Sequence, residues 1–377
     1  MADVILRGMT WDHPRGYDPM VATSAAYAAR HPGVTITWEK RSLQAFADRP
    51  ISEMAETYDL MVIDHPHVGE VARQGNLLAL DGLRDGEMAA LAAGSVGLSH
   101  RSYEFAGRQW ALAIDTATPV ACLRPDRLDA PPRLWSEVLE LAREGQVGFA
   151  LIPINALMTF FGMACNLGHA VAECPDELMA PQEATQVLEL MVEVAGLMDR
   201  RCLTLDPIGI YEWMGRHADG PAYSPFGYGY TNYSRSGFCQ FPLAFHDAPG
   251  VERPDPTGTV LGGTGIAVSA FTKHPDVAVD YAFWIAGAEC QKGLYTASGG
   301  QPAHAAAWDD PACNALTGNF FANTRRTLET AWLRPRYDGY MGFQDVAGTL
   351  VHRCLTGEAT IAATVTALQA AYRESRR

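Results

Sequence analysis

Apolar runs of strand length alternate with helix-length segments along the first 63 residues. The apolar runs are short and rich in β-branched residues, whereas the segments between them show helical composition or spacing and end at Pro or Gly signals. The order β-α-β-α-β predicts a parallel sheet with helices on both faces. Strands are predicted over Val4–Trp11, Val34–Trp38 and Tyr58–Ile63, and helices over Pro19–Arg30 and Leu43–Thr57.

Two polar segments follow strands of this predicted sheet, at residues 12–17 and 64–67. In open α/β sheets, ligands bind at the loops that follow the carboxyl ends of the strands. Both segments are therefore predicted to be loops that face one binding site.

The rest of the chain continues the α/β pattern without an internal repeat or a linker. This continuity predicts two lobes that exchange strands across a hinge. Residues 220–247 are rich in Gly, Pro and aromatic residues, and are either a loop packed on its own rings or the lining of a cleft. Further strands are predicted over Trp110–Ile114, Phe149–Ile154 and Ile266–Ser269. Helices are predicted from the segment Pro131–Trp135, which opens one that runs to about Glu144, from Pro181 onward, over Asp276–Leu294 and over Ala359–Glu374.

Composition and charge narrow the class of protein. The 377 residues are 48% hydrophobic, which is enough for two globular domains. The net charge of −14 argues against a nucleic-acid partner. There is no apolar run of about 18 residues, so no membrane insertion is expected. No signal peptide precedes Trp11, so we expect a cytoplasmic protein if Met1 is the natural start, and a periplasmic or extracellular one if a leader was removed.

The eight cysteines show no CxxC or Cys/His ligand spacing. Several lie in apolar settings, which favours buried free thiols. The segment Asp64-His65-Pro66-His67, together with His13, invites a zinc hypothesis, but two histidines in a Pro-containing loop leave a third ligand to be found elsewhere. We therefore predict no metal and no cofactor. Gly262-Gly263-Thr264-Gly265 misses the dinucleotide spacing and precedes a strand, so it predicts a turn with exposed backbone N–H groups.

The order of several short motifs resembles one known family. Residues 58–63 and 72–83 (which contain Gly75-Asn76-Leu77-Leu78-Ala79-Leu80-Asp81) are similar to a strand, loop, helix and G-x-L-x-x-L-D passage of the ABC-transporter extracellular solute-binding proteins of the maltose-binding, family 1 type. Other similar passages are 110–118 with 122–128, 131–138, 262–268, 278–291 and 299–303. Leu123-Arg124-Pro125 departs from the Tyr-Asn-Lys usual there.

This resemblance implies a two-lobed α/β fold of the type II periplasmic-binding-protein kind, with crossing strands at the hinge and closure on a ligand without catalysis. The implied lobes are 1–115 plus about 261–310, and about 116–260 plus about 311–377. The implied partners are a small-molecule ligand and an ABC-transporter permease, for a chain expected to be a monomer. A cytoplasmic metabolite-binding relative and an enzyme on the same scaffold, with or without a metal, stay open as alternatives.

The candidate ligand-binding residues combine hydrogen-bonding side chains with aromatic rings. Two ligand classes fit them: an anionic, carboxylate-bearing molecule, which is preferred because the arginines and histidines outnumber the nearby acids, and a carbohydrate, favoured by the family. No catalytic residue is predicted. The candidates are Trp11, Asp12, His13, Arg15, Tyr17, Asp64, His65, His67, Asp115, Thr116, Tyr228, Tyr230, Gly263, Thr264, Gln301, Arg334 and Tyr337.

Overall fold

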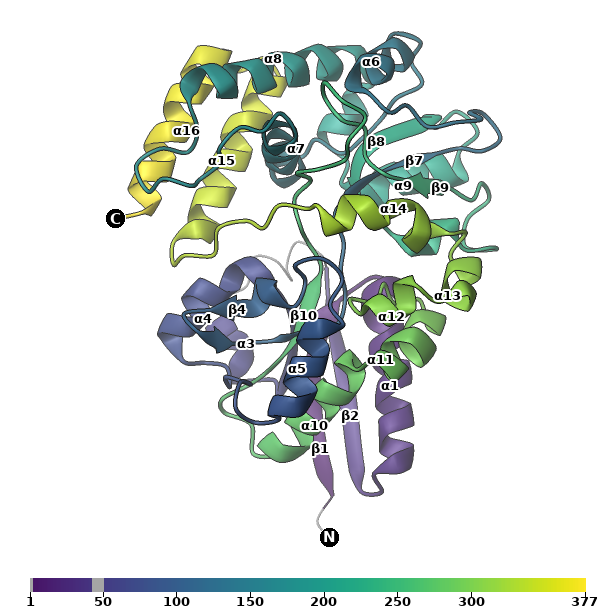
Figure 1. The fold of residues 1–377 in the computed structure, drawn as a ribbon, viewed down its shortest axis with the longest axis vertical. Helices are drawn as coiled ribbons and strands as arrows, with labels where there is room; N and C mark the ends of the chain where they lie inside the picture. Colours follow the sequence, from purple (N-terminus) through teal and green to yellow (C-terminus); the bar gives the residue numbers. More distant parts are fainter. Residues whose placement is uncertain (1–2, 43–50) are drawn as a thin grey trace. The chain divides into compact units, whose positions relative to one another are not determined.

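The computed structural model describes residues 3–42 and 51–377. Within these residues the chain divides into two compact units (Figure 1). Unit 1 comprises Met1–Ala117, Gly262–Thr317 and Arg336–Asp338, and unit 2 comprises Thr118–Leu261, Gly318–Pro335 and Gly339–Arg377. The fold is mixed α/β, as predicted.

Unit 1 is built on a five-stranded sheet of order β2-β1-β3-β10-β6. β1 pairs in parallel with β2 and with β3, which confirms the predicted parallel start of the chain. β10 runs antiparallel to β3 and β6, with Thr264 opposite Asp64. The carboxyl ends of β1 and β3 and the amino end of β10 therefore share one edge. The strands are β1 (Val4–Trp11), β2 (Val34–Arg41), β3 (Leu60–Asp64), β6 (Leu112–Ala113) and β10 (Thr264–Val268).

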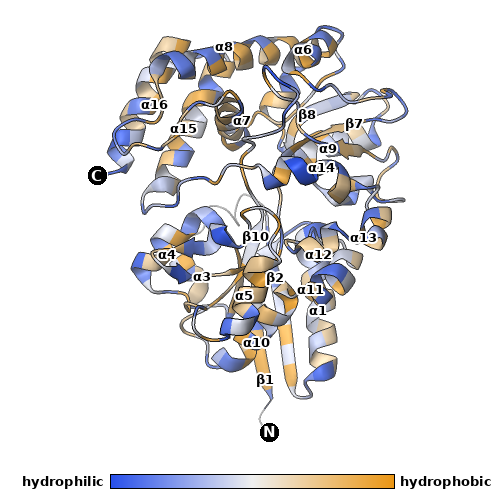
Figure 2. Ribbon diagram, in the orientation of Figure 1, coloured by the Kyte–Doolittle hydropathy of each residue, from blue (hydrophilic) through white to orange (hydrophobic). Residues whose placement is uncertain are grey.

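Apolar side chains from this sheet form the core of unit 1. Leu60, Met61 and Val62 of β3 are fully buried, as are Ile266 and Val268 of β10. Figure 2 shows hydrophobic residues along β1 and in the first half of β2, while the helices mix both colours. The helices of unit 1 are α1 (Pro14–Arg30), α3 (Ile51–Ala55), α4 (Val68–Gln74), α5 (Asp85–Ala93), α10 (Pro275–Ala286), α11 (Ala288–Cys290), α12 (Ala305–Trp308) and α13 (Pro311–Leu316). Short elements complete it: η1 (His65–His67), η2 (Arg101–Tyr103), η5 (Gln291–Tyr295) and the β4–β5 hairpin (Glu104–Phe105, Arg108–Gln109).

Unit 2 has a three-stranded antiparallel sheet of order β8-β7-β9, surrounded by helices. α8 begins at Pro181, as predicted. The strands are β7 (Pro119–Leu123), β8 (Tyr223–Tyr228) and β9 (Ala244–His246). The helices are α6 (Trp135–Arg143), α7 (Pro153–Asn166), α8 (Pro181–Leu197), η3 (Arg200–Leu203), α9 (Pro207–Arg216), η4 (Thr231–Ser234), α14 (Phe320–Glu329), α15 (Tyr340–Leu355) and α16 (Ile361–Ser375).

Several predicted element boundaries are wrong. Residues 14–17 belong to α1 and not to a loop, because Pro14 occupies the first helical position and the His13 side chain accepts a hydrogen bond from the Arg15 N–H. Residues 65–67 form the short helix η1. The predicted helix 276–294 is interrupted at Gly287, whose extended backbone ends α10 before the π-helical turn η5. The predicted helix over Leu43–Thr57 falls mainly on residues 43–50, outside the described residues; only α3 is seen there.

Two more predictions fail in unit 2. The strand predicted over Phe149–Ile154 does not form, because Gly148 and Leu151 donate to two different segments, at Tyr223 and Cys202, and do not share one ladder. The aromatic stretch 220–247 is not simply a loop, since it supplies β8 and β9. Its rings pack on their neighbours, as in the edge-on contact of Tyr233 and Phe238 at 5.1 Å.

Candidate functional site

The edge of the unit 1 sheet carries most of the predicted site residues. β1 and β3 are adjacent and parallel, so the segments that follow them lie at the same edge. Trp11 ends β1 and His13 follows it, while Asp64 ends β3 and His65 follows it. Thr264 begins β10 opposite Asp64.

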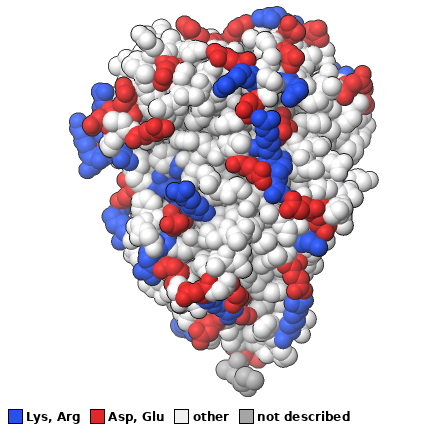
Figure 3. Space-filling view, viewed as in Figure 1, with Lys and Arg blue, Asp and Glu red and all other residues white. Residues whose placement is uncertain are grey.

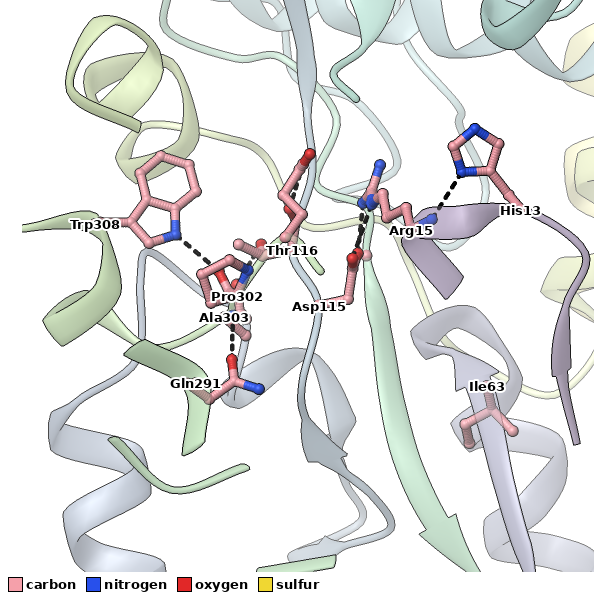
Figure 4. A network of polar contacts seen from close by, with 12 residues as sticks. His13, Arg15, Ile63, Asp115, Thr116, Gln291, Pro302, Ala303 and Trp308 are labelled. Atoms are coloured by element: carbon pink, nitrogen blue, oxygen red, sulfur yellow. Dashed lines mark hydrogen bonds and ion pairs between the residues drawn. The ribbon is translucent and has the colours of Figure 1, made fainter. Parts of the chain in front are cut away.

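A buried ion pair connects this edge to the segment that follows β6. Arg15 donates from Nε to Asp115 at 2.8 Å and from Nη2 at 2.5 Å (Figure 4). Both side chains are almost fully buried. Burial raises the pKa of Asp115, and the adjacent Arg15 guanidinium works against that rise. The positive charge of Arg15 is thus already compensated within unit 1.

His13 is a neutral cap of α1. Its Nδ1 accepts the Arg15 backbone N–H at 3.0 Å, which requires an unprotonated nitrogen (Figure 4). Burial, with the nearby Arg15 charge, lowers the pKa of His13 to about 4. At neutral pH this histidine adds no positive charge to the edge.

Trp11 and Gly16 make the turn into α1 possible. Trp11 is 3% exposed, and a Cβ built on Gly16 would lie 2.3 Å from its ring. Only glycine lets the helix pass so close to the indole. Nearby, the exposed Asp12 pairs with Lys40 at 2.7 Å, and the Lys40 ammonium lies 5.0 Å from the Tyr17 ring centroid.

Backbone pairing fixes the segment from Asp115 to Ala117. Asp115 and Thr264 exchange two backbone hydrogen bonds, and Thr116 bonds to both the carbonyl and the side-chain amide of Gln301. Gly263 has φ +106°, and a Cβ there would lie 2.4 Å from the Asp115 carbonyl oxygen. The segment Gly262-Gly263-Thr264-Gly265 therefore brings its backbone into close contact with the backbone of Asp115. Its N–H groups at Gly262 and Thr264 are hydrogen-bonded and not exposed, contrary to the prediction.

A buried polar network supports Thr116. Its Oγ1 lies 2.6 Å from Ser99 Oγ. Gln291, in η5, accepts the Ala303 N–H, and the Trp308 indole donates to the Pro302 carbonyl (Figure 4). Ser99 and Gln291 are part of this support but are not among the predicted residues, since a single Ser or Gln carries no sequence pattern.

His65 and His67 are buried in η1, where the His65 ring lies edge-on to Tyr103 at 6.2 Å. Tyr103 donates to the carbonyls of Ile63 and Gly263. In the part of the chain that the structure describes, no three His, Cys, Asp or Glu side chains are placed to hold a metal ion. The zinc hypothesis for Asp64, His65 and His67 therefore has no ligand set there.

Tyr337 belongs to the short segment Arg336–Asp338 that completes unit 1. This segment passes so close to Gly69 of α4 that a Cβ there would clash with the Arg336 carbonyl. The Arg336 guanidinium donates to the carbonyls of Arg101 and Ser102. Tyr337 is thereby placed beside α4 and η2.

The remaining three predicted residues lie in unit 2. Tyr228 ends β8, and Tyr230 packs 6.3 Å from Tyr211 between ring centroids. Arg334 is 7% exposed and donates from Nη1 to Gln344 of α15 at 2.7 Å. No carboxylate among the described residues pairs with Arg334, and its Nε has no hydrogen-bond partner there.

Several further buried side-chain atoms share this property among the described residues, including Thr264 Oγ1 in unit 1 and Asn232 Oδ1 in unit 2. Leaving such a group unpaired costs about 1–3 kcal/mol, which a bound ligand can recover. Asn232 is absent from the predicted set.

A family model decides which class of protein this is. The model of the bacterial extracellular solute-binding proteins matches residues 22–320, well over half of the chain. The chain belongs to this family. It is a solute-binding protein of the ABC-import type, as the sequence motifs indicated.

Solved structures agree with the fold of this solute-binding protein. Maltose-bound MalE3 of T. maritima has a TM-score of 0.83 at 16% identity, over 98% of this chain and 99% of that one. The GacH receptor of Streptomyces glaucescens, solved unliganded and with acarbose, has a TM-score of 0.81 at 15% identity, over 100% of this chain and 99% of that one. A protein of Agrobacterium radiobacter in complex with ribitol has a TM-score of 0.81 at 17% identity, over 99% of each chain. No curated protein sequence matches the chain.

The charge and hydropathy of the solute-binding protein are consistent with this class. Acidic and basic residues are interspersed over the face in Figure 3. None of the described helices is both long and apolar enough to cross a membrane. All eight cysteines are free, and burial raises the pKa of the Cys202 thiol to about 11, so this thiol is unreactive at neutral pH.

Proposed function

We propose that this protein captures a neutral sugar or polyol for ABC-type import and releases it unchanged. The observation that carries the proposal is the mixture of buried donors and acceptors without a partner in the described residues. Arg334 Nε can only donate, Asn232 Oδ1 can only accept, and Thr264 Oγ1 can do both. A hydroxyl also donates and accepts, whereas a carboxylate only accepts, so the hydroxyls of a sugar or polyol can pair with either kind of atom.

Three further observations support a neutral ligand. Arg15 is compensated by Asp115, and His13 is neutral, which removes most of the positive charge that favoured an anion. The net charge of −14 repels anions at long range. The similar structures described above contain maltose, acarbose or ribitol.

An aromatic side chain near Arg334 suits a sugar ring. Trp332 is half-buried, stands two residues before Arg334, and packs edge-on against Phe161 at 5.6 Å. An indole this near to Arg334 in the chain can cover the apolar face of a sugar whose hydroxyls reach the guanidinium.

An anionic ligand is the second candidate, because Arg334 lacks a carboxylate partner among the described residues. A thermal-shift panel of matched pairs separates the two: glucose with glucuronate, and ribitol with ribonate. At 100 times its dissociation constant a ligand adds about 2.7 kcal/mol of stability. We expect the stabilising compounds to be neutral members; stabilisation by the acids alone would favour the anion. The permease partner and closure on the ligand stay predictions, and small-angle scattering with the stabilising compound measures the closure.

A further inference from the structure

A pocket lies in unit 1, on helices that carry none of the residues proposed to bind the transported solute. Its volume is about 210 Å³, and its lining residues come from the end of α1, the start of α5 and the second half of α10. Figure 1 labels these three helices. Drug-sized ligands occupy about 300–1,000 Å³, so this pocket suits a smaller, one-ring molecule. Its main lining residues are Tyr27, Arg30, His31, Arg84, Asp280 and Trp284.

Three aromatic rings form the wall of the pocket. Tyr27 and His31, one helical turn apart on α1, stack with centroids 4.0 Å apart and planes 12° apart. The Trp284 indole lies 5.7 Å from Tyr27, tilted by 48°. Flat apolar faces of this kind bind a planar ring.

Asp280, one of the two acidic side chains that line the pocket, is already engaged. Asp280 accepts from the Tyr27 hydroxyl at 2.6 Å and from Arg84 Nη2 at 2.6 Å. Arg84 also pairs with Glu87 at 3.2 Å. Tyr27, Arg84 and Asp280 therefore hold the pocket in shape and leave little capacity for a ligand.

Arg30 is the group that remains available. Its guanidinium carbon lies 5.5 Å from the Trp284 ring centroid, and no carboxylate among the described residues pairs with it. An arginine fork of this kind takes a carboxylate in bidentate geometry. We infer that this pocket binds a small aromatic carboxylate, with its ring on Trp284 and its carboxylate on Arg30.

The balance of charge selects a carboxylate over a phosphate ester. Arg30 supplies one uncompensated positive charge, and the Glu87 carboxylate also lines the pocket. A phosphate monoester carries about −1.5 to −2 at neutral pH and would meet more repulsion there than a singly charged carboxylate.

Calorimetric titration of the whole protein with benzoate tests this inference. We expect one saturable site, with affinity about tenfold lower in Arg30→Gln, as for loss of a charge-assisted hydrogen bond. The benzoate affinity of Trp284→Leu should be about threefold lower than that of the parent. The control variant Arg133→Gln alters an exposed arginine of unit 2, outside the pocket, and should bind benzoate as the parent does. Melting temperatures confirm that each variant is folded.

Three related probes define the ligand class. Benzamide, cyclohexanecarboxylate and phenyl phosphate should each bind more weakly than benzoate, because they lack the charge, lack the flat ring or carry excess charge. No saturable binding of benzoate at millimolar concentration, or equal affinity in Arg30→Gln, would overturn the inference. Tighter binding of any of the three probes would overturn the assigned class. A saturating neutral sugar should leave the benzoate affinity unchanged.

Discussion

Arg15 and Asp115 form a bidentate ion pair that joins the first turn of α1 to the segment after β6. The two residues are 100 positions apart in the sequence, and both are nearly inaccessible to water. Removing one partner of a buried pair leaves an uncompensated charge, which costs about 3–5 kcal/mol. This pair therefore stabilises the architecture of the sheet edge.

We predict that Asp115→Asn lowers the free energy of unfolding by about 3 kcal/mol, measured by denaturant titration. Arg143→Gln, at the exposed pair with Glu193, should change it by less than about 1 kcal/mol. The double variant Arg15→Met/Asp115→Leu should regain much of the loss, because no buried charge remains. Equal effects of Asp115→Asn and Arg143→Gln would show that the pair is not important for stability.

His13 should make the protein sensitive to mild acid. Its pKa is about 4 in the folded chain and near 6.5 in the unfolded chain, so between these values the unfolded state binds more protons. Its contribution is present above pH 6.5 and is lost as the pH falls toward 4, by up to about 3 kcal/mol. In His13→Asn, which keeps a capping oxygen, the melting temperature should fall less between pH 7 and pH 4.5 than in the parent. Parallel melting curves of the two proteins would refute this role.

Gly263 should not tolerate a side chain. Its φ of +106° is strained for other residues, and a Cβ would press on the Asp115 carbonyl. We expect Gly263→Ala to lower the free energy of unfolding by about 2 kcal/mol or more. The matched change Gly86→Ala, on α5 with nothing within 4 Å of the new Cβ, should be neutral or stabilising by up to about 1 kcal/mol. Similar melting temperatures for both variants would contradict the close contact.

The sequence predicts the sheet of unit 1 well because its strands are short, buried and bounded by turn residues. β1 has the predicted bounds, Val4–Trp11, and α8 starts at the predicted Pro181. The start of α1 is missed because a capping histidine is uncommon, and Pro14 there looks like a turn residue. The break at Gly287 is missed because a single glycine within an apolar helical pattern is often tolerated.

The candidate site could be predicted only in part. The positions at strand ends follow from topology, so His13, Asp64 and Thr264 could be found from the order of elements. Their pairing could not: nothing in the sequence relates Arg15 to Asp115, or Arg334 to Gln344. The preference for an anionic ligand depended on counting arginines without knowing which one is neutralised.

Calorimetric titration of Arg334 variants tests the central claim most directly, using the neutral sugar or polyol that stabilises the protein best. The parent should bind one molecule per chain, and Arg334→Gln should lose about tenfold in affinity because a buried donor to a ligand hydroxyl is gone. Arg334→Lys should recover only part of the lost affinity, since lysine lacks the planar guanidinium fork. Arg353→Gln, at an exposed ion pair on α15, should bind as the parent does. Unchanged affinity in Arg334→Gln, or recovery of a chemically altered ligand, would contradict the account.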